Sequence, residues 1–277
     1  MKLTNKQRFN NICKDIKEIK IQGATNVAKA ALKSYYLFPS KKTKKKLLSL
    51  RPTEPMMYNI LKIITKCDES YFLDHFEKTQ EMINRQVSKL IKKNDVVFTH
   101  CHSSSVVKAL IYTKKQGKKF EVYNTETRPL YQGRKTAKEL SKAGIKVTNF
   151  VDSAIGIALD KEQGTKNVDL VLLGADAILK DGVINKVGSN TIAELAYYQK
   201  IPVYIIADSW KYSNKPVKLE QRKYEEVWKK HKNINIRNPA FEKIESKYIK
   251  GIISELGKFT LKGFISQVKK KYKLMFG

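Results

Sequence analysis

Long apolar runs and cysteines are both scarce in this sequence, and each scarcity excludes a class of protein. The most apolar stretches, residues 168–173 and 201–207, are far shorter than the roughly 20 residues that a membrane-spanning helix needs. The first residues, MKLTNKQRFNNICKDIK, contain no apolar segment of the kind that directs secretion. The three cysteines, Cys13, Cys67 and Cys101, are widely spaced and fit a reducing compartment better than a disulfide framework. We therefore expect a cytoplasmic protein with no membrane partner.

Acidic residues are also few, since 26 Asp and Glu oppose 55 Lys and Arg and leave a formal net charge of +29. This excess excludes an acidic, self-repelling tail protein. It favours a negatively charged partner, such as nucleic acid, a lipid surface or a phosphorylated small molecule. Two lysine-rich runs, at residues 41–46 and 269–271, have aromatic neighbours and could contact nucleic acid. No RNA-binding motif of known spacing accompanies them, so we favour a solvated surface and keep nucleic acid as an alternative.

Apolar periodicity divides the chain into two parts. Up to about residue 93 the spacing is helical, with one helix after Gly23 and a long helix over residues 68–93. From residue 95 onward, short apolar segments alternate with helical segments, which is typical of βαβ units and a mostly parallel sheet. The expected strands are 96–100, 120–123, 145–151, 168–173 and 203–207, and the expected helices are 104–115, 134–143 and 190–199. The sequence thus predicts an α/β fold, with a helical N-terminal domain at residues 1–93 and a Rossmann-like, mostly parallel sheet domain at residues 94–277.

Polar and small side chains follow these expected strands. Parallel sheets bind ligands outside the carboxyl ends of their strands, so we expect the functional site at this edge. A purely structural scaffold would not need Cys, Asp, Arg and two Lys there. The segments are THCHSSS at 99–105, TETRP at 125–129, DSA at 152–154, GAD at 174–176, NKVG at 185–188 and DSWK at 208–211.

Cys101 lies directly after a strand and before a helix, where backbone N–H groups and the positive helix end favour a thiolate. We interpret it as a general base or nucleophile, although a small buried hydrophobic residue is the commoner role of a free cysteine. The next residues, Ser103, Ser104 and Ser105, could bind a phosphate through hydroxyl and backbone N–H groups. Simple capping of the helix also explains these serines.

Asp176 and two histidines complete the set of titratable candidates. A carboxyl at the rim of a partly dry pocket has a raised pKa, so Asp176 could act as a general acid, with a turn or helix cap as the alternative. His100 and His102 suggest a metal site together with Cys101. Alternation along a strand would point Cys101 away from both histidines, so we expect no bound metal.

Cationic side chains beside the polar segments are candidates for binding anions. In a chain this basic, they gain weight only from that position. The candidates are Arg51, Arg128, Lys186 and Lys211. A second phosphate could bind at Gly23, Ala24 and Thr25, because these small residues open a helix.

Taken together and in this order, the motifs resemble the archaeal ribose 1,5-bisphosphate isomerases. That family shares a superfamily with the methylthioribose-1-phosphate isomerases and with the regulatory subunits of translation initiation factor 2B. The resemblance is continuous from about residue 96 to 213, in THCHSSSVV, TETRPLYQGRKTAKEL, VDSA, GADAI, INKVGSNTIAELA and IADSWKY. Cys101 and Asp176 resemble the isomerases rather than the initiation-factor subunits, and His102-Ser103 resembles the ribose-bisphosphate branch.

The resemblance implies a reaction and a set of roles. Cys101 would remove the C2 proton of the sugar, and Asp176 would act as the acid that opens the furanose ring. The reaction would be an aldose–ketose isomerisation of α-ribose 1,5-bisphosphate to ribulose 1,5-bisphosphate, without cofactor or metal, in a homo-oligomer that is a dimer or a hexamer. The substrate, chiefly its phosphates, would be bound by Gln22, Gly23, Ala24, Thr25, Arg51, Ser103, Ser104, Ser105, Asn185, Lys186 and Lys211.

One position departs from that family. Gln22 stands where the family has arginine, so a charge-assisted phosphate contact worth about 1.5–3 kcal/mol is missing. Lys29, two turns along the expected helix, is a candidate for a partial substitute. The departure keeps two alternatives open: an isomerase of another 1-phosphorylated aldose, such as methylthioribose 1-phosphate, and a non-catalytic regulatory subunit of the initiation-factor type.

Overall fold

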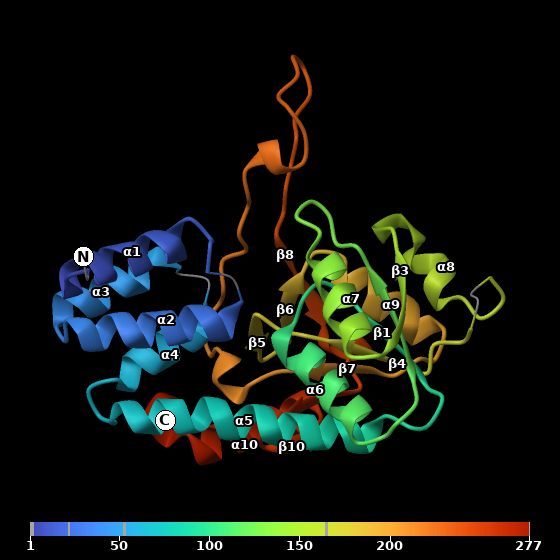
Figure 1. Cartoon of the computed structure of the whole chain (residues 1–277), viewed down its shortest axis with the longest axis horizontal. Coiled ribbons are helices and arrows are strands. Elements are labelled where there is room, and N and C mark those ends of the chain that lie inside the picture. The colour runs from blue at the N-terminus through green and yellow to red at the C-terminus, as the bar shows by residue number, and fades with distance from the viewer. Residues whose placement is uncertain (1–2, 22, 52–53, 164–165, 277) are drawn as a thin grey trace.

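A computed structural model describes residues 3–21, 23–51, 54–163 and 166–276 of the chain. Helices dominate the N-terminal part, and a mostly parallel sheet with helices on both faces forms the rest (Figure 1). The expected α/β fold is confirmed. Within the described residues, every helix is either too short or too polar to span a lipid bilayer.

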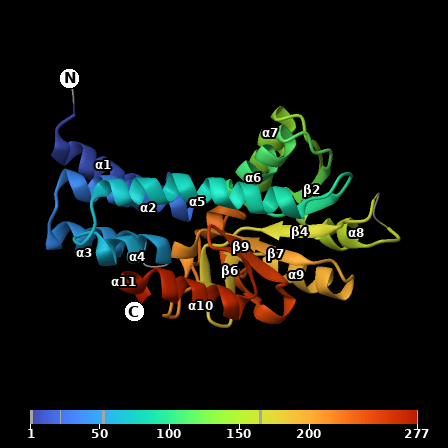
Figure 2. The same ribbon diagram turned by 90° about the horizontal axis from the view of Figure 1, so that it is seen from below.

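The described residues of the N-terminal part form five helices. They are α1 (Asn5–Lys17), α2 (Ala24–Leu37), α3 (Lys41–Leu50), α4 (Pro55–Ile63) and α5 (Glu69–Leu90). The long helix α5 buries Phe72, Phe76, Ile83 and Val87 on one side, as the periodicity predicts. Figures 1 and 2 show that α5 runs from the other four helices along the sheet domain, where it packs against α6 and β9. Because α5 serves both parts, the boundary between residues 93 and 94 stays a prediction.

A seven-stranded sheet forms the centre of the second part, in the order β10-β9-β7-β4-β1-β2-β3. The expected strands are β1 (Val96–Thr99), β2 (Glu121–Thr125), β3 (Lys146–Phe150), β4 (Leu170–Leu173) and β7 (Val203–Ile206). The pattern did not indicate β9 (Gly251–Ser254) or β10 (Gly257–Phe259), and β10 is the antiparallel strand. The strand order reverses between β1 and β4, which is where open α/β sheets bind ligands.

Helices cover both faces of this sheet because its strands are apolar on both sides. Val97 and Leu172 face the layer formed by α5, α6 (Ser104–Lys115) and α7 (Gln132–Lys142). Phe98 and Val171, their neighbours along the strands, belong to the opposite core. That core includes α8 (Ile155–Leu159), α9 (Ser189–Tyr198), α10 (Leu261–Lys271) and α11 (Lys273–Phe276).

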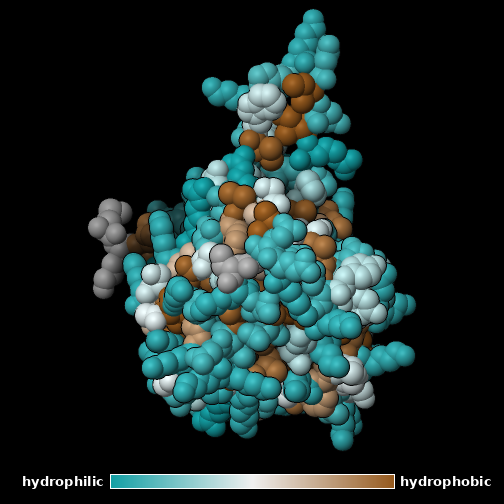
Figure 3. Space-filling view, turned by 90° about the vertical axis from the view of Figure 1, so that its right-hand side faces the viewer, coloured by the Kyte–Doolittle hydropathy of each residue, from teal (hydrophilic) through white to brown (hydrophobic). Residues whose placement is uncertain are grey.

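A second sheet and a projecting arm are features that the sequence pattern did not predict. The small antiparallel sheet joins β5 (Ala177–Leu179), β6 (Gly182–Lys186) and β8 (Phe241–Glu245). Residues 213–240 lead from η2 (Ser209–Lys211) to β8 and project from the body as an arm (Figure 1). Figure 3 shows apolar and polar side chains mixed on this projection. The two lysine-rich runs lie on α3 and on the last turn of α10.

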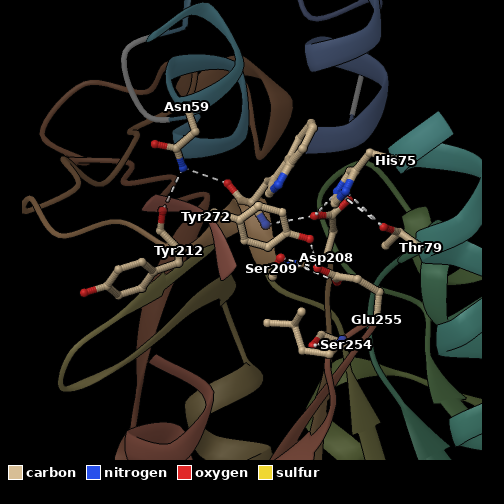
Figure 4. Close-up of polar contacts among 11 residues, drawn as sticks. Asn59, His75, Thr79, Asp208, Ser209, Tyr212, Ser254, Glu255 and Tyr272 are labelled. Atoms are coloured by element: carbon tan, nitrogen blue, oxygen red, sulfur yellow. Dashed lines mark hydrogen bonds and ion pairs between the residues drawn. The ribbon is translucent and has the colours of Figure 1, made fainter. Parts of the chain in front are cut away.

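A buried polar cluster joins the helical part to the sheet domain (Figure 4). The side-chain amide of Asn59, on α4, donates hydrogen bonds of 2.8 Å to the carbonyls of Trp210 and Tyr212. His75, on α5, lies 3.0 Å from a carboxylate oxygen of Asp208. These contacts hold η2, and therefore Lys211, against the N-terminal helices.

We expect Asn59→Ala to lower the free energy of unfolding by about 2–4 kcal/mol, because it leaves two buried carbonyls without their donor. Alanine is a better helix former than asparagine, so helix propensity cannot cause such a loss. Chemical denaturation would measure the change. The control, Asn10→Ala on an exposed part of α1, should change stability by less than about 0.5 kcal/mol. An equal effect of the two substitutions would contradict a role for Asn59 at the junction.

Candidate active site

A cavity of about 190 Å³ lies between the start of α2, the residues Arg51 and Glu54 near the start of α4, and the carboxyl ends of β1 and β4. Side chains from β6, η2 and the base of the arm complete its wall. The structure brings most of the predicted site residues to this one place. They are Gly23, Ala24, Thr25, Arg51, Cys101, Ser103, Ser104, Asp176, Asn185, Lys186 and Lys211.

Two predicted residues and the candidate substitute lie away from the cavity, and one predicted residue is not described. Gln22 lies outside the described residues. Ser105 is buried within α6, and its carbonyl accepts a hydrogen bond from Gln80. Arg128 is exposed and donates to the Tyr131 hydroxyl (2.6 Å) and to the carbonyl of Val227 on the arm. Lys29 has its ammonium 4.9 Å from the Phe76 ring, and like Ser105 and Arg128 it does not line the cavity.

A left-handed backbone conformation places Cys101 in the cavity wall, with φ at +64°. Its N–H donates to the Thr127 hydroxyl (3.0 Å), and its carbonyl accepts from the Thr136 hydroxyl (2.8 Å). Asp152, from the DSA motif, accepts in turn from the Thr127 N–H (2.9 Å). The polar segments after β2 and β3 therefore hold the cysteine in place.

The same turn overturns the expected alternation of Cys101 with its flanking histidines. Strand β1 ends at Thr99, so extended geometry stops before Cys101, and His100, Cys101 and His102 all line the cavity. Both ring nitrogens of His100 have hydrogen-bond partners: Nδ1 bonds the Thr125 hydroxyl, and Nε2 donates to the Val187 carbonyl (2.9 Å). Burial lowers its pKa and keeps the ring neutral.

Burial dominates the titration of Cys101 and Asp176, the two candidate acid–base groups. It raises the pKa of Cys101 to about 11, against the opposing effect of the Lys186 ammonium. The expected preference for a thiolate is therefore wrong, since desolvation outweighs the Lys186 charge and the hydrogen bond from the His102 backbone. Burial also raises the pKa of Asp176, while Lys211, Arg51 and Lys186 oppose the shift. A raised pKa favours the protonated form that a general acid needs.

Three local features shape the cavity wall. Ser103 caps α6, with its hydroxyl accepting from the Val106 N–H, so the positive helix end faces the cavity wall. A Cβ at Gly174 would lie 2.7 Å from Ser103 Oγ, so only glycine allows the segments after β1 and β4 to meet. Gly23, with φ at +84°, begins α2 on the opposite wall.

Several cavity residues escaped the sequence analysis. Glu54, Gln132 and Lys135 line the wall, as do Glu220 and Arg222 from the base of the arm. Glu54 lies only three residues after the predicted Arg51, whereas Glu220 and Arg222 follow none of the expected strands. Arg51 Nε, Glu54 Oε2 and Gln132 Oε1 are buried without a hydrogen-bond partner among the described residues. Buried polar atoms of this kind are available to hydrogen-bond a polar ligand.

The charges that line the cavity fit a small anionic ligand. Among the described residues, five cationic side chains line the cavity, and the carboxyls of Glu54, Asp176 and Glu220 accompany them. The cations are Arg51, Lys135, Lys186, Lys211 and Arg222. Side chains that could together bind a metal ion lie outside this cavity. Within the described part of the chain, the metal-ligand atoms of His75, Asp208 and Glu255 lie within 4.8 Å of one another. In the junction cluster, His75 hydrogen-bonds Asp208 directly, and Glu255 accepts from the Ser209 N–H and the Tyr272 hydroxyl.

Comparison with known proteins gives a consistent picture. A model of the Initiation factor 2 subunit family matches residues 20–261. The ribose 1,5-bisphosphate isomerase of Methanocaldococcus jannaschii is 34% identical over 279 aligned residues, which cover 87% of this chain and 88% of that protein. The protein of the same name from Archaeoglobus fulgidus is 32% identical, with 87% and 86% covered.

Solved structures share the fold. The crystal structure of translation initiation factor eIF-2B from Pyrococcus horikoshii superimposes with a TM-score of 0.81 at 27% identity, covering 92% of this chain and 97% of that one. The 5-methylthioribose 1-phosphate isomerase from the same organism superimposes with a TM-score of 0.77 at 22% identity, over 95% and 87% of the two chains. The helical N-terminal part and the parallel sheet are thus common to this set.

We expect Cys101 to react slowly with iodoacetamide at pH 7, because the thiolate is the reactive form and its pKa is about 11. The rate should rise about tenfold per pH unit below that pKa. Lys186→Met should slow the reaction further, since it removes the cation that lowers the pKa. Peptide mass spectrometry would follow Cys101 separately from Cys13 and Cys67, and rapid alkylation at pH 7 would contradict the raised pKa.

Proposed function

This chain belongs to the Initiation factor 2 subunit family, and within that family we propose that it is an aldose–ketose isomerase converting α-ribose 1,5-bisphosphate into ribulose 1,5-bisphosphate. One observation carries the proposal: Cys101 and Asp176 line the same cavity, from the ends of adjacent strands, with five cations around them. An acid, a base and phosphate-binding groups are what this isomerisation requires.

The first step opens the sugar ring. The Cys101 thiolate takes the proton from C2, the C1=C2 double bond forms, and the C1–O4 bond breaks. Protonated Asp176 gives its proton to O4, which becomes the C4 hydroxyl. The product of this step is an enol that keeps the phosphate on C1.

The second step restores both groups. The Asp176 carboxylate takes the proton of the C2 hydroxyl, the C2 carbonyl forms, and the Cys101 thiol delivers its proton to C1. Carbon C1 is reduced as C2 is oxidised, so the reaction needs no external oxidant or reductant. For this reason we expect neither cofactor nor metal to take part.

The cations of the cavity support a substrate with two phosphates. Arg51 and Lys211 lie on the side of the N-terminal helices and η2, while Ser103 and Ser104 present the end of α6. The charge of Lys186 acts on both Cys101 and Asp176 and lowers the pKa of each. We assign the phosphates to these groups and to the backbone at Gly23–Thr25.

Two further expectations accompany this assignment. A 5-methylthioribose 1-phosphate substrate remains the alternative, since an isomerase of that compound shares the fold. It would use one phosphate and leave part of the positive charge unpaired. We also expect a homo-oligomer, a dimer or a hexamer, with a phosphorylated sugar rather than nucleic acid as the partner of the site.

The direct test follows the conversion of α-ribose 1,5-bisphosphate by phosphorus NMR with the purified full chain. We expect turnover in the natural protein, and a loss of about 10²–10⁴-fold in Cys101→Ser and in Asp176→Asn, the range that general acid–base groups contribute. Both variants should still bind the substrate, which calorimetry would show. Full turnover by Cys101→Ser would contradict the base, and binding without turnover by the natural protein would favour a regulatory subunit.

A competition experiment tests the substrate. We expect kcat/KM for 5-methylthioribose 1-phosphate to be about 10- to 150-fold lower than for ribose 1,5-bisphosphate, because one charge-assisted phosphate contact worth about 1.5–3 kcal/mol is lost. Lys211→Met should raise KM for the bisphosphate without abolishing kcat. A preference for the methylthio sugar would replace the proposed substrate and keep the proposed chemistry.

A further inference from the structure

Glu54 occupies an unusual place for a carboxylate. It is the residue directly before α4, and only 3% of it is exposed. Its side chain lines the cavity, on the wall that the N-terminal helices supply. Buried glutamates are rare unless they are paired or protonated, because removing a charge from water is costly.

The two carboxyl oxygens of Glu54 have different surroundings. Oε1 accepts a hydrogen bond of 3.0 Å from Arg51 Nη2, and the same nitrogen lies 3.4 Å from Glu220. Oε2 is buried and has no hydrogen-bond partner among residues 3–21, 23–51, 54–163 and 166–276. One oxygen is therefore tied to a guanidinium, and the other is available to a proton.

A second desolvated carboxyl, that of the half-buried Asp176, acts on Glu54 from the sheet domain. The charge of Asp176 disfavours ionisation of Glu54, and the cations Arg51 and Lys211 oppose this effect on both carboxyls. Glu220, from the arm, adds a further negative charge to the same group. Two desolvated carboxyls in one cavity do not both ionise readily. The pair therefore releases its last proton at a higher pH than either carboxyl would alone.

We propose that Glu54 is a positioning residue for the acid of the reaction: Glu54 and Asp176 form a carboxyl pair that shares one proton, and Arg51 biases that proton toward Asp176. The inference rests on the proposed function. Its geometric basis is the common cavity, the Arg51 bond to Oε1 and the unpartnered Oε2. The Arg51 hydrogen bond stabilises the ionised form of Glu54 directly, whereas Lys211 and Arg51 reach Asp176 through charge alone.

The pair has a consequence for the pH dependence of turnover. The reaction needs Asp176 protonated and Cys101 deprotonated, although Cys101 has the higher pKa of about 11. The fraction of enzyme in this state therefore grows as the pKa of Asp176 rises. The acidic limb of the kcat/KM profile follows the carboxyl pair, and the alkaline limb follows the thiol.

Glu54→Gln tests the pair. The amide keeps the shape and an oxygen for Arg51 but removes the charge, so the pKa of Asp176 should fall by about 1 unit or more. We expect the acidic limb to move to lower pH by that amount and the maximum kcat to drop about tenfold or more, with a smaller change in KM. A raised KM with an unmoved acidic limb would show that Glu54 merely holds Arg51, and would overturn the proposal.

Glu226→Gln is the matched control. Glu226 binds Arg222, a cavity arginine, just as Glu54 binds Arg51, but Glu226 does not line the cavity. Its pKa is lowered by that arginine rather than raised. This variant should keep the pH profile of the natural protein. An equal shift in both variants would assign the effect to the overall charge of the cavity and would contradict the pair.

Stability provides a readout that does not depend on the reaction. Burial raises the pKa of Glu54 to about 7 and also raises the pKa of Asp176, so the folded carboxyl pair holds a proton that the unfolded chain releases near pH 4.5. That contribution to stability is complete below about pH 4.5 and is lost as the pH rises through 7. Glu54→Gln should flatten this fall between pH 5 and 8 in denaturation experiments, and Glu226→Gln should not.

The two readouts separate failure of the pair from failure of the proposed function. If the protein does not isomerise ribose 1,5-bisphosphate but Glu54→Gln flattens the stability profile, the carboxyl pair stands and the proposed function falls. If turnover is present and both profiles of Glu54→Gln match those of the natural protein, the pair is wrong and the proposed function stands.

Discussion

The parallel pairing of β1 with β4 is the contact on which the candidate site depends. Val97 lies beside Leu170 and Phe98 beside Val171, so the chain leaves both strands at the same edge. Cys101 and Asp176 come two and three residues after these strands end, and neither could reach the other if the strands were not neighbours. The absence of a side chain at Gly174 lets Ser103 close the gap between the two segments. The core residues on both faces of β1 and β4 fix this pairing by burial.

Burial raises the pKa of both proposed reacting groups, with opposite consequences for their proposed roles. The raised pKa of Asp176 favours the protonated form that the proposed acid needs, whereas the raised pKa of Cys101 disfavours the thiolate that the proposed base needs. The proposed reaction needs a Cys101 thiolate and a protonated Asp176. This reactive arrangement carries the same number of protons as the arrangement with a Cys101 thiol and an Asp176 carboxylate. The proton has only to move within the cavity, and no exchange with solvent is needed. Neighbouring charges such as Lys186 and Glu54 then set how often the reactive arrangement occurs.

Much of this could be predicted from the sequence, because local patterns encode it. Short apolar segments between helical segments indicated the parallel strands, and the polar residues that follow them indicated the edge of the sheet where the cavity lies. Long-range pairing was out of reach: β6 belongs to an antiparallel sheet with β5 and β8, so Asn185 and Lys186 enter the cavity from a strand that periodicity did not reveal. Glu220 and Arg222 come from an arm without regular pattern. The raised pKa of Cys101 depends on desolvation, which a sequence does not display.

The site is divided between two parts of the chain, so its geometry depends on the junction between them. Arg51, Glu54 and the start of α2 belong to the N-terminal helices, whereas Cys101, Asp176 and Lys211 belong to the sheet domain. Asn59 holds the carbonyls on either side of Lys211, and His75 stacks on Trp210 with ring centroids 3.4 Å apart (Figure 4). Lys211 then reaches the Ala175 carbonyl at 2.6 Å, directly beside Asp176. A change at the junction therefore moves a cation relative to the acid, and junction packing is part of the electrostatics of the cavity.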